Sequence, residues 1–400
     1  MRKLLIMFLF IALLLTGCWS AQELSDITLA TAMAIDTADD GFTMTLQVLN
    51  PNEIAGDQRS DKSTISTYSA SGNTVFEANR RLTQALPRRV HLSHLQLIVF
   101  GEELAKEGIG RTLDYLIRDH ELRTDFTITI AQKITGRELI SVLTPLEETP
   151  ATKITSSIES SEDFWAPTKE VKLDELIESV TSEGKEAILT GIHVTGDPEA
   201  GQKKTNTQQT VPTAQIYLDG IGVFKGDKLQ GWMNEQESKG FNYITDNVSN
   251  TLSWVECNDE GRLSLEITDS KTTAQGDYQN GDPVINIKVD VQANIGEVEC
   301  AIDLNDPHEL QLIQQKAEER TNQILKASIM KAQEFGSDIF GFGNMIKRAK
   351  PKEWEKVKEN WSTIFPNLQV NVQSKVEMKQ SGMINKPIYD TIKKKNQTEE

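Results

Sequence analysis

The hydrophobic and polar positions of this chain repeat with two different periods. Residues 27–36, 42–49 and 124–132 are strand-length runs in which apolar residues alternate with polar ones or follow each other directly. Residues 74–86 instead repeat apolar side chains at helical spacing, which predicts an amphipathic helix that Pro87 ends. The same patterns predict further strands at 63–70, 90–100, 186–195, 214–233, 251–257, 262–268, 284–300 and 367–382, and further helices at 101–107, 110–119, 136–143, 169–183 and 234–241.

The longest predicted helix lies in the C-terminal half, near 307–335. Asp306 suits the N-cap, Pro307 the first helical position, and Glu309 the acidic position of a capping box. One face carries an apolar stripe formed by Leu310, Ile313, Ala317, Leu325, Ala332 and Phe335. The other faces carry Gln, Lys, Glu and Arg, so we expect the helix to lie on a sheet with a single buried face.

The order of these elements favours the α+β class over a regular parallel repeat. A chain of 400 residues suggests two or three domains. Residues 196–212 are polar and contain Gly and Pro, which predicts a linker or mobile loop. We therefore expect an N-terminal α+β region at 18–195, in one or two lobes, and a C-terminal α+β domain at 213–390. Both would have mixed or antiparallel sheets flanked by helices.

The first eighteen residues have the pattern of a bacterial lipoprotein leader. Arg2 and Lys3 precede twelve consecutive apolar residues, Leu4 to Leu15. As a helix this run would be about 18 Å long, too short for the ~30 Å hydrocarbon core, so it predicts a signal peptide (1–17). The run ends in Leu15-Thr16-Gly17-Cys18, which resembles a lipobox. That resemblance implies cleavage before Cys18, a diacylglycerol thioether on its sulfur and a fatty acyl group on its amine. The alternative is an ordinary secretory signal followed by an unmodified cysteine.

Charge and composition exclude several kinds of protein. Acidic residues outnumber basic ones by 59 to 42, for a net charge of −17. This balance argues against a nucleic-acid partner and against electrostatic adsorption to anionic lipid, because both need clustered basic residues. Three cysteines in the chain are too few for a disulfide-rich scaffold.

Two cysteines remain beyond the leader, Cys257 and Cys300. Both lie near the ends of predicted strands, and an extracytoplasmic location permits a disulfide. A bridge closing a loop of about 40 residues would add about 3–4 kcal/mol of stability. The residues leave two alternatives open: a cross-strand disulfide or two free thiols.

The sequence carries no recognised catalytic, metal or cofactor motif. His91 and His94 fall in the predicted strand 90–100, where their spacing puts them on opposite faces, so we interpret them as core or interface residues. The glycines of 220–226 suit a hairpin better than a phosphate-binding turn. The acidic pairs Glu102-Glu103 and Glu147-Glu148 are typical of solvated faces. We therefore expect no catalytic residue, no metal and no cofactor.

Trp354 and Trp361 are the most conspicuous aromatic pair. Their separation of seven residues would place them on one side of a predicted short helix. We interpret them as core residues, with a ligand platform as the alternative.

Several segments together resemble one family, the Ger(x)C lipoproteins, which are the C subunits of nutrient germinant receptors in endospore-forming bacteria. The resemblance covers nearly all of 17–387, in the family's order. Its segments are Gly17-Cys18-Trp19, Glu23-Leu24, Ala34-Ile35-Asp36, PRRVHLSHLQLIVFGEELAKEGI (87–109), LDYLIRDHELRTDF (113–126), GIGVFKGDKLQGWMNEQESKGFNYIT (220–245) and the long block from 338 to 387. The chain departs from the family at Ser20-Ala21, where an acidic and a basic residue are more usual.

The resemblance implies a non-enzymatic lipoprotein on the outer face of the spore inner membrane. Its partners would be two membrane subunits, a large membrane protein and a permease-like protein, which together detect a small nutrient and start germination. The alternative is a lipid-anchored solute-binding protein of a transporter. That alternative would predict two similar lobes around a cleft.

Overall fold

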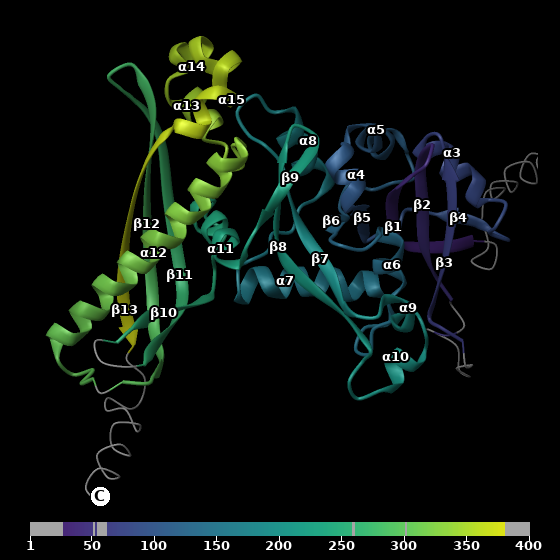
Figure 1. The fold of residues 1–400 in the computed structure, drawn as a ribbon, viewed down its shortest axis with the longest axis horizontal. Helices are drawn as coiled ribbons and strands as arrows, with labels where there is room; N and C mark the ends of the chain where they lie inside the picture. The colour runs from purple at the N-terminus through teal and green to yellow at the C-terminus, as the bar shows by residue number, and fades with distance from the viewer. Residues whose placement is uncertain (1–26, 51–52, 54–61, 258–260, 301, 381–400) are drawn as a thin grey trace, which may run out of the picture.

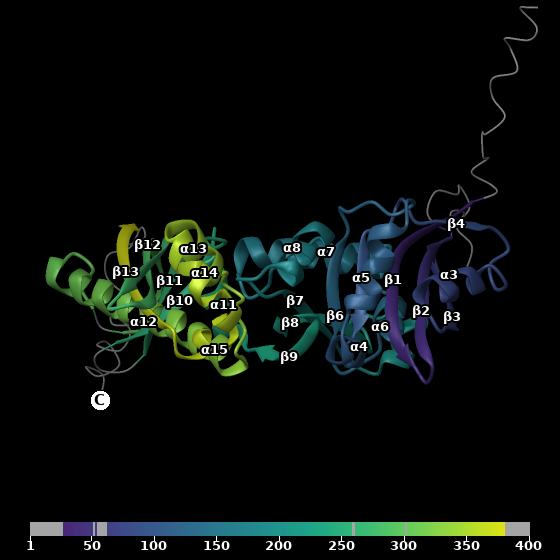
Figure 2. The ribbon, with the colours of Figure 1, turned by 90° about the horizontal axis from the view of Figure 1, so that it is seen from above.

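The computed structural model describes residues 27–50, 53, 62–257, 261–300 and 302–380, and two sheets organise them (Figure 1). The regions around the two sheets lie next to each other along the longest axis of the molecule, in both views (Figures 1 and 2). Helices flank each sheet, so the predicted α+β class is confirmed.

The first sheet has nine strands in the order β3-β2-β1-β5-β6-β7-β8-β9, with β4 paired to β1. The strands are β1 (Ile27–Ala38), β2 (Gly41–Leu49), β3 (Ile65–Gly72), β4 (Arg89–His91), β5 (Leu97–Gly101), β6 (Thr127–Ala131), β7 (Ile188–Gly196), β8 (Ala214–Lys225) and β9 (Lys228–Met233). The central strands β1, β5, β6 and β7 are parallel, and the pairs at both edges are antiparallel. Every residue of β5 and β6 is buried, as expected for parallel strands covered on both faces.

Successive side chains of a strand point to opposite faces of the sheet. Both faces of this sheet carry apolar side chains, and helices cover each of them. On one face, Met33 and Ile35 of β1 join the core formed with α3 (Val75–Leu82), α4 (Glu102–Glu107), α5 (Gly110–Arg118) and α8 (Leu173–Thr181). On the other face, Ala32 and Ala34 pack with α6 (Gly136–Ser141) and α7 (Pro150–Phe164).

The second sheet has four strands in the order β10-β11-β12-β13. They are β10 (Thr251–Glu256), β11 (Arg262–Gln279), β12 (Asp282–Val298) and β13 (Gln369–Gln380). The long hairpin β11–β12 turns at Asn280 and Gly281, whose φ angles are 55° and 93°. A two-residue hairpin turn of this type requires a positive φ at both central residues. Asn and Gly adopt positive φ more readily than other residues, so Asn-Gly is favoured here.

Helix α12 (Pro307–Phe335) connects the parallel strands β12 and β13, and it crosses this sheet in Figure 1. Its 29 residues match the predicted helix, and the Asp306 side chain caps it by accepting from the His308 backbone N–H. Gly336, in the left-handed conformation, ends it. Shorter helices complete this region: α11 (Glu235–Ile244), α13 (Phe342–Ala349), α14 (Pro351–Val357), α15 (Trp361–Ile364) and the 3₁₀ turns η2 (Lys358–Asn360) and η3 (Phe365–Asn367).

The segment predicted to be a linker, 196–212, is folded against the first sheet. It contains α9 (Pro198–Gly201) and α10 (Thr205–Gln208). The buried Asn206 side chain donates to the backbone carbonyls of Leu143 (2.8 Å) and Ala214 (3.0 Å). The flanking strands β7 and β8 are neighbours in one sheet, so this segment connects two strands of the same sheet. The predicted boundary at 212–213 therefore does not separate the two sheets.

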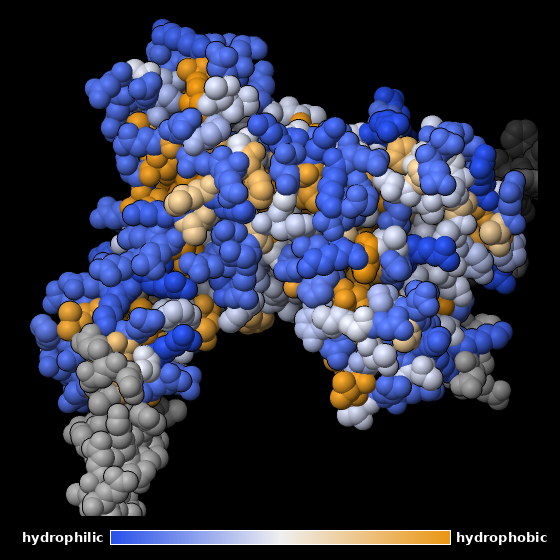
Figure 3. All heavy atoms as spheres, in the orientation of Figure 1, coloured by the Kyte–Doolittle hydropathy of each residue, from blue (hydrophilic) through white to orange (hydrophobic). Residues whose placement is uncertain are grey.

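The face of the molecule in Figure 3 is mostly hydrophilic, with small scattered hydrophobic patches. This surface agrees with the net charge of −17. None of the helices in the described residues combines the length and apolar character that a membrane crossing would need.

Candidate functional site

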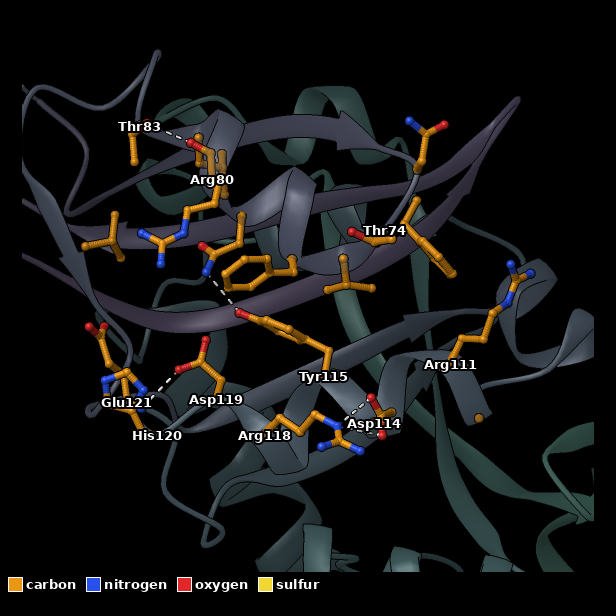
Figure 4. A pocket seen from close by; sticks show the side chains of 18 of the residues that line it. Thr74, Arg80, Thr83, Arg111, Asp114, Tyr115, Arg118, Asp119, His120 and Glu121 are labelled. Carbon is orange, nitrogen blue, oxygen red and sulfur yellow. Dashed lines mark hydrogen bonds and ion pairs between the residues drawn. The ribbon is translucent and has the colours of Figure 1, made fainter.

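A groove of about 980 Å³ lies between α3 and α5 on one face of the first sheet (Figure 4). Phe42 of β2, Val90 of β4 and Val75 and Leu82 of α3 contribute apolar side chains to its lining. Its two walls are short helices with one buried face each, so their outer faces remain available at the rim. The groove has the size of a small-molecule or peptide site.

Four arginines line the groove: Arg80, Arg88, Arg111 and Arg118. Arg118 pairs with Asp114 on the same helix, with an Nε–Oδ2 distance of 2.9 Å. Arg80 lies over the ring of Phe76 at 5.0 Å, and Arg111 lies over the ring of Phe42 at 5.4 Å. Within the part of the chain that the structure describes, the guanidinium groups of Arg80, Arg88 and Arg111 make no ion pair or hydrogen bond. They are therefore available to an anion.

Tyr115 closes one side of the groove with a neutral hydroxyl. Burial, followed by the charge of Asp119, raises its pKa. The Tyr115 oxygen accepts a hydrogen bond from Asn79 Nδ2 across the groove, at 3.0 Å. Together with the arginines, this arrangement can bind an anionic group next to an apolar surface.

The predicted lipidation residue, Cys18, lies outside the described residues. The described residues begin nine positions later at Ile27, where β1 pairs in parallel with β4. The β4 segment carries Val90, and Arg88 precedes it, so the first residues of β1 lie beside the groove lining.

Cys257 and Cys300 lie in the second region and are joined by a disulfide, with their Cα atoms 6.3 Å apart. Cys257 follows the end of β10 and Cys300 follows the end of β12, so the bridge connects two strands that both pair with β11. Its place at the end of the sheet indicates a structural role.

The histidines differ from their predicted placement. His91 ends β4, whereas His94 is exposed in a turn before β5, so the predicted strand 90–100 is two short strands and the residues do not share one. His120 lines the groove, although the sequence did not single it out. The glycines of 220–226 lie in the β8–β9 hairpin, as predicted. No group of three or more His, Cys, Asp or Glu side chains in the described residues could hold a metal ion.

Trp354 and Trp361 are core residues, as predicted. Their ring centroids are 5.3 Å apart at an interplanar angle of 65°, and both side chains are buried. They come from α14 and α15, so the prediction of one continuous helix is wrong. Trp361 Nε1 donates to Asp338 Oδ2 at 2.9 Å.

Asp338 also connects the two regions. Its carboxylate accepts from the backbone N–H groups of Phe342 (2.9 Å) and Gly343 (2.8 Å), and its carbonyl accepts from Glu186 N (2.8 Å) of the first region. Burial raises the pKa of Asp338 to about 6, against the opposing effect of these donors. The neighbouring Ser337 hydroxyl donates to the Phe224 carbonyl of β8.

A signal for the groove was present in the sequence as arginine clustering. Seven of the thirteen arginines fall in one 44-residue stretch, at 80, 81, 88, 89, 111, 118 and 123. The net charge of the whole chain conceals this local excess of arginine.

Comparisons with protein-family models match both halves of the chain. The model described as "Spore germination protein N-terminal domain" matches residues 20–194. The model described as "Spore germination B3/ GerAC like, C-terminal" matches residues 219–382. The two matches cover both sheets.

Known proteins match over nearly the whole chain. Spore germination protein KC of Bacillus subtilis is 30% identical over 98% of this chain and 98% of its own length. Spore germination protein B3 of the same organism is 25% identical over 91% of this chain and 93% of its own length. The crystal structure of the GerBC protein shares the fold, with a TM-score of 0.55, 19% identity, and coverage of 86% of this chain and 96% of that one. The chain therefore belongs to the Ger(x)C family of spore germination proteins.

Proposed function

We propose that this protein is a lipid-anchored, non-enzymatic subunit of a nutrient germinant receptor, required for spores to germinate in response to small nutrients. The observation that carries the proposal is the match to spore germination protein KC, which spans both regions of the fold. A similarity of this length supports a shared role and not only a shared domain.

The anchor is Cys18, modified with diacylglycerol on sulfur and an acyl group on the amine. The leader Leu4–Leu15 and the lipobox-like Leu15-Thr16-Gly17-Cys18 support this assignment. A single acyl chain gives only marginal membrane binding, whereas two or more chains hold a protein stably. The anchored protein would lie on the outer face of the spore inner membrane.

The partners are two membrane subunits of the same receptor, one large membrane protein and one permease-like protein. Anchoring confines this subunit to the membrane surface, which raises its effective concentration near those partners. The groove between α3 and α5 offers arginine and tyrosine side chains that suit binding, which supports a role in recognition.

The transporter alternative is not favoured. A solute-binding protein would have two similar lobes, whereas the two regions here have sheets of nine and four strands. The known proteins named above are also spore germination proteins.

The test is a Cys18→Ala substitution in spores that carry only this receptor. We expect the fold to persist while recovery of the two membrane subunits with the tagged protein, and nutrient-triggered germination, both fall. Ser20→Ala, which leaves the cysteine in place, is the matched control and should behave as wild type. Full germination by the unanchored variant would refute the proposal.

A further inference from the structure

We propose that the face formed by α3 and α5 rests on an anionic phospholipid surface beside the anchor. The inference rests on the proposed lipid anchor, which brings this face to a membrane. It adds a second, protein-based contact that sets the orientation of the molecule.

The first argument is charge complementarity. Arg80, Arg88 and Arg111 line one groove and make no ion pair within the described residues, although Asp114, Asp119 and Glu121 line it too. Guanidinium groups bind phosphates through several donors at once. An anionic lipid surface attracts each nearby arginine by about 1 kcal/mol, while the acidic remainder of the protein is repelled.

The second argument is the exposed apolar surface among these arginines. Phe76 of α3 is 51% exposed and Ile117 of α5 is 57% exposed. Phe76 lies one turn before Arg80 on α3, and Ile117 shares α5 with Arg111, so exposed apolar and cationic side chains occur together on both helices. The carboxylates of Glu77 and Asp114 on the same helices are paired with Arg81 and Arg118. Surfaces that bind at the membrane interface combine these two types of side chain.

The third argument is the reach of the tether. Ile27 follows Cys18 by nine positions, and a fully extended segment of that length spans at most about 30 Å. The first residues of β1 pair with β4, which contributes Val90 to the groove lining. The groove is therefore the part of the fold that an anchor at Cys18 holds close to the membrane.

Docking through this face would orient the whole molecule. Both ribbon views place α3 and β4 at one end of the long axis, and β13 and α12 at the other (Figures 1 and 2). The second region lies toward the other end of the long axis, outside this contact, and stays available to the membrane partners.

The experiment measures vesicle binding by the mature chain made without its anchor, residues 19–400. We expect it to co-sediment with vesicles of phosphatidylglycerol mixed with phosphatidylcholine, and not with phosphatidylcholine alone. Raising the salt concentration should weaken the binding. The pair of substitutions Arg88→Gln and Arg111→Gln should lower the partition coefficient roughly 25-fold, or about fivefold for each arginine.

The matched control is Arg348→Gln with Lys352→Gln, two exposed cations of α13 and α14 in the second region. It changes the net charge equally and should leave vesicle binding unchanged. Melting curves of both variants should match wild type, since Arg88 and Arg111 make no ion pair in the described part of the chain. Equal loss in both pairs would overturn the proposal.

Absence of vesicle binding by the wild-type chain would also overturn it. If the groove variant then lost the membrane subunits in a pull-down from spores, the groove would be assigned to a protein partner. A lipid-modified Cys18 in the same spores would leave the proposed function standing in either case.

Discussion

The region around the first sheet and the region around the second use their polar side chains in opposite ways. In the first, three arginines of the α3–α5 groove stay without ionic partners in the described structure, at the surface. In the second, Asp338 is buried and accepts hydrogen bonds from Trp361 and two backbone N–H groups. The comparison indicates that cationic side chains without ionic partners gather in the first region, and that Asp338 lies among the contacts between the two regions.

The largest expected effect is that of Trp361→Ala. This change removes a buried aromatic ring and the hydrogen bond to Asp338, so the free energy of unfolding should fall by ~3–5 kcal/mol, measured by denaturant titration. Phe164→Ala, which removes a ring that is 68% exposed, is the control and should change stability by no more than about 0.5 kcal/mol. An unchanged melting curve for the Trp361 variant would contradict its place in the core.

Removal of the disulfide should have the next largest effect. The bridge spans 43 residues, so Cys257→Ser with Cys300→Ser should lower the free energy of unfolding by about 3–4 kcal/mol, because the unfolded chain gains freedom. Thiol labelling of denatured, unreduced residues 19–400 checks the bridge directly, since this chain has no other cysteine. A count of two modified thiols would rule the disulfide out.

A smaller, pH-dependent effect should come from Asp338. A carboxyl whose pKa is raised on folding keeps its proton in the folded state at a pH where the unfolded chain has lost it. The stabilisation that Asp338 adds to the free energy of unfolding is therefore full below about pH 4. It declines as pH rises and is lost above about pH 6. Between these limits wild type should lose roughly 2–3 kcal/mol relative to Asp338→Asn. A stability difference that stays constant across this range would disprove the titration of Asp338.

Local signals explain which elements could be predicted from the sequence. Helix α12 was predictable because Asp306, Pro307 and an apolar stripe agree. The second half of β11 was missed because residues 269–279 are mostly polar, although Asn280-Gly281 is a hairpin signal. Helix α7 was missed because its sequence is rich in Ser and Thr and only a few apolar residues, such as Ile154 and Ile158, are buried.

The groove could not be predicted from the sequence, because its lining residues come from segments that are distant along the chain. Its walls come from α3 and α5, which are separated by β4, β5 and α4 in the sequence. Arginine clustering marks the stretch but does not show that Arg80 and Arg111 line the same cavity. The pairing of β1 with β2, β4 and β5 brings these segments together.

The central claim is that a lipid on Cys18 holds this protein at the membrane with its groove facing the surface. Mass spectrometry of the N-terminal peptide, taken from protein purified from native spores, tests it most directly. The account predicts a peptide that begins at Cys18 and carries the mass of diacylglycerol and an acyl chain. An unmodified Cys18, or a peptide that still includes residues 1–17, would contradict it.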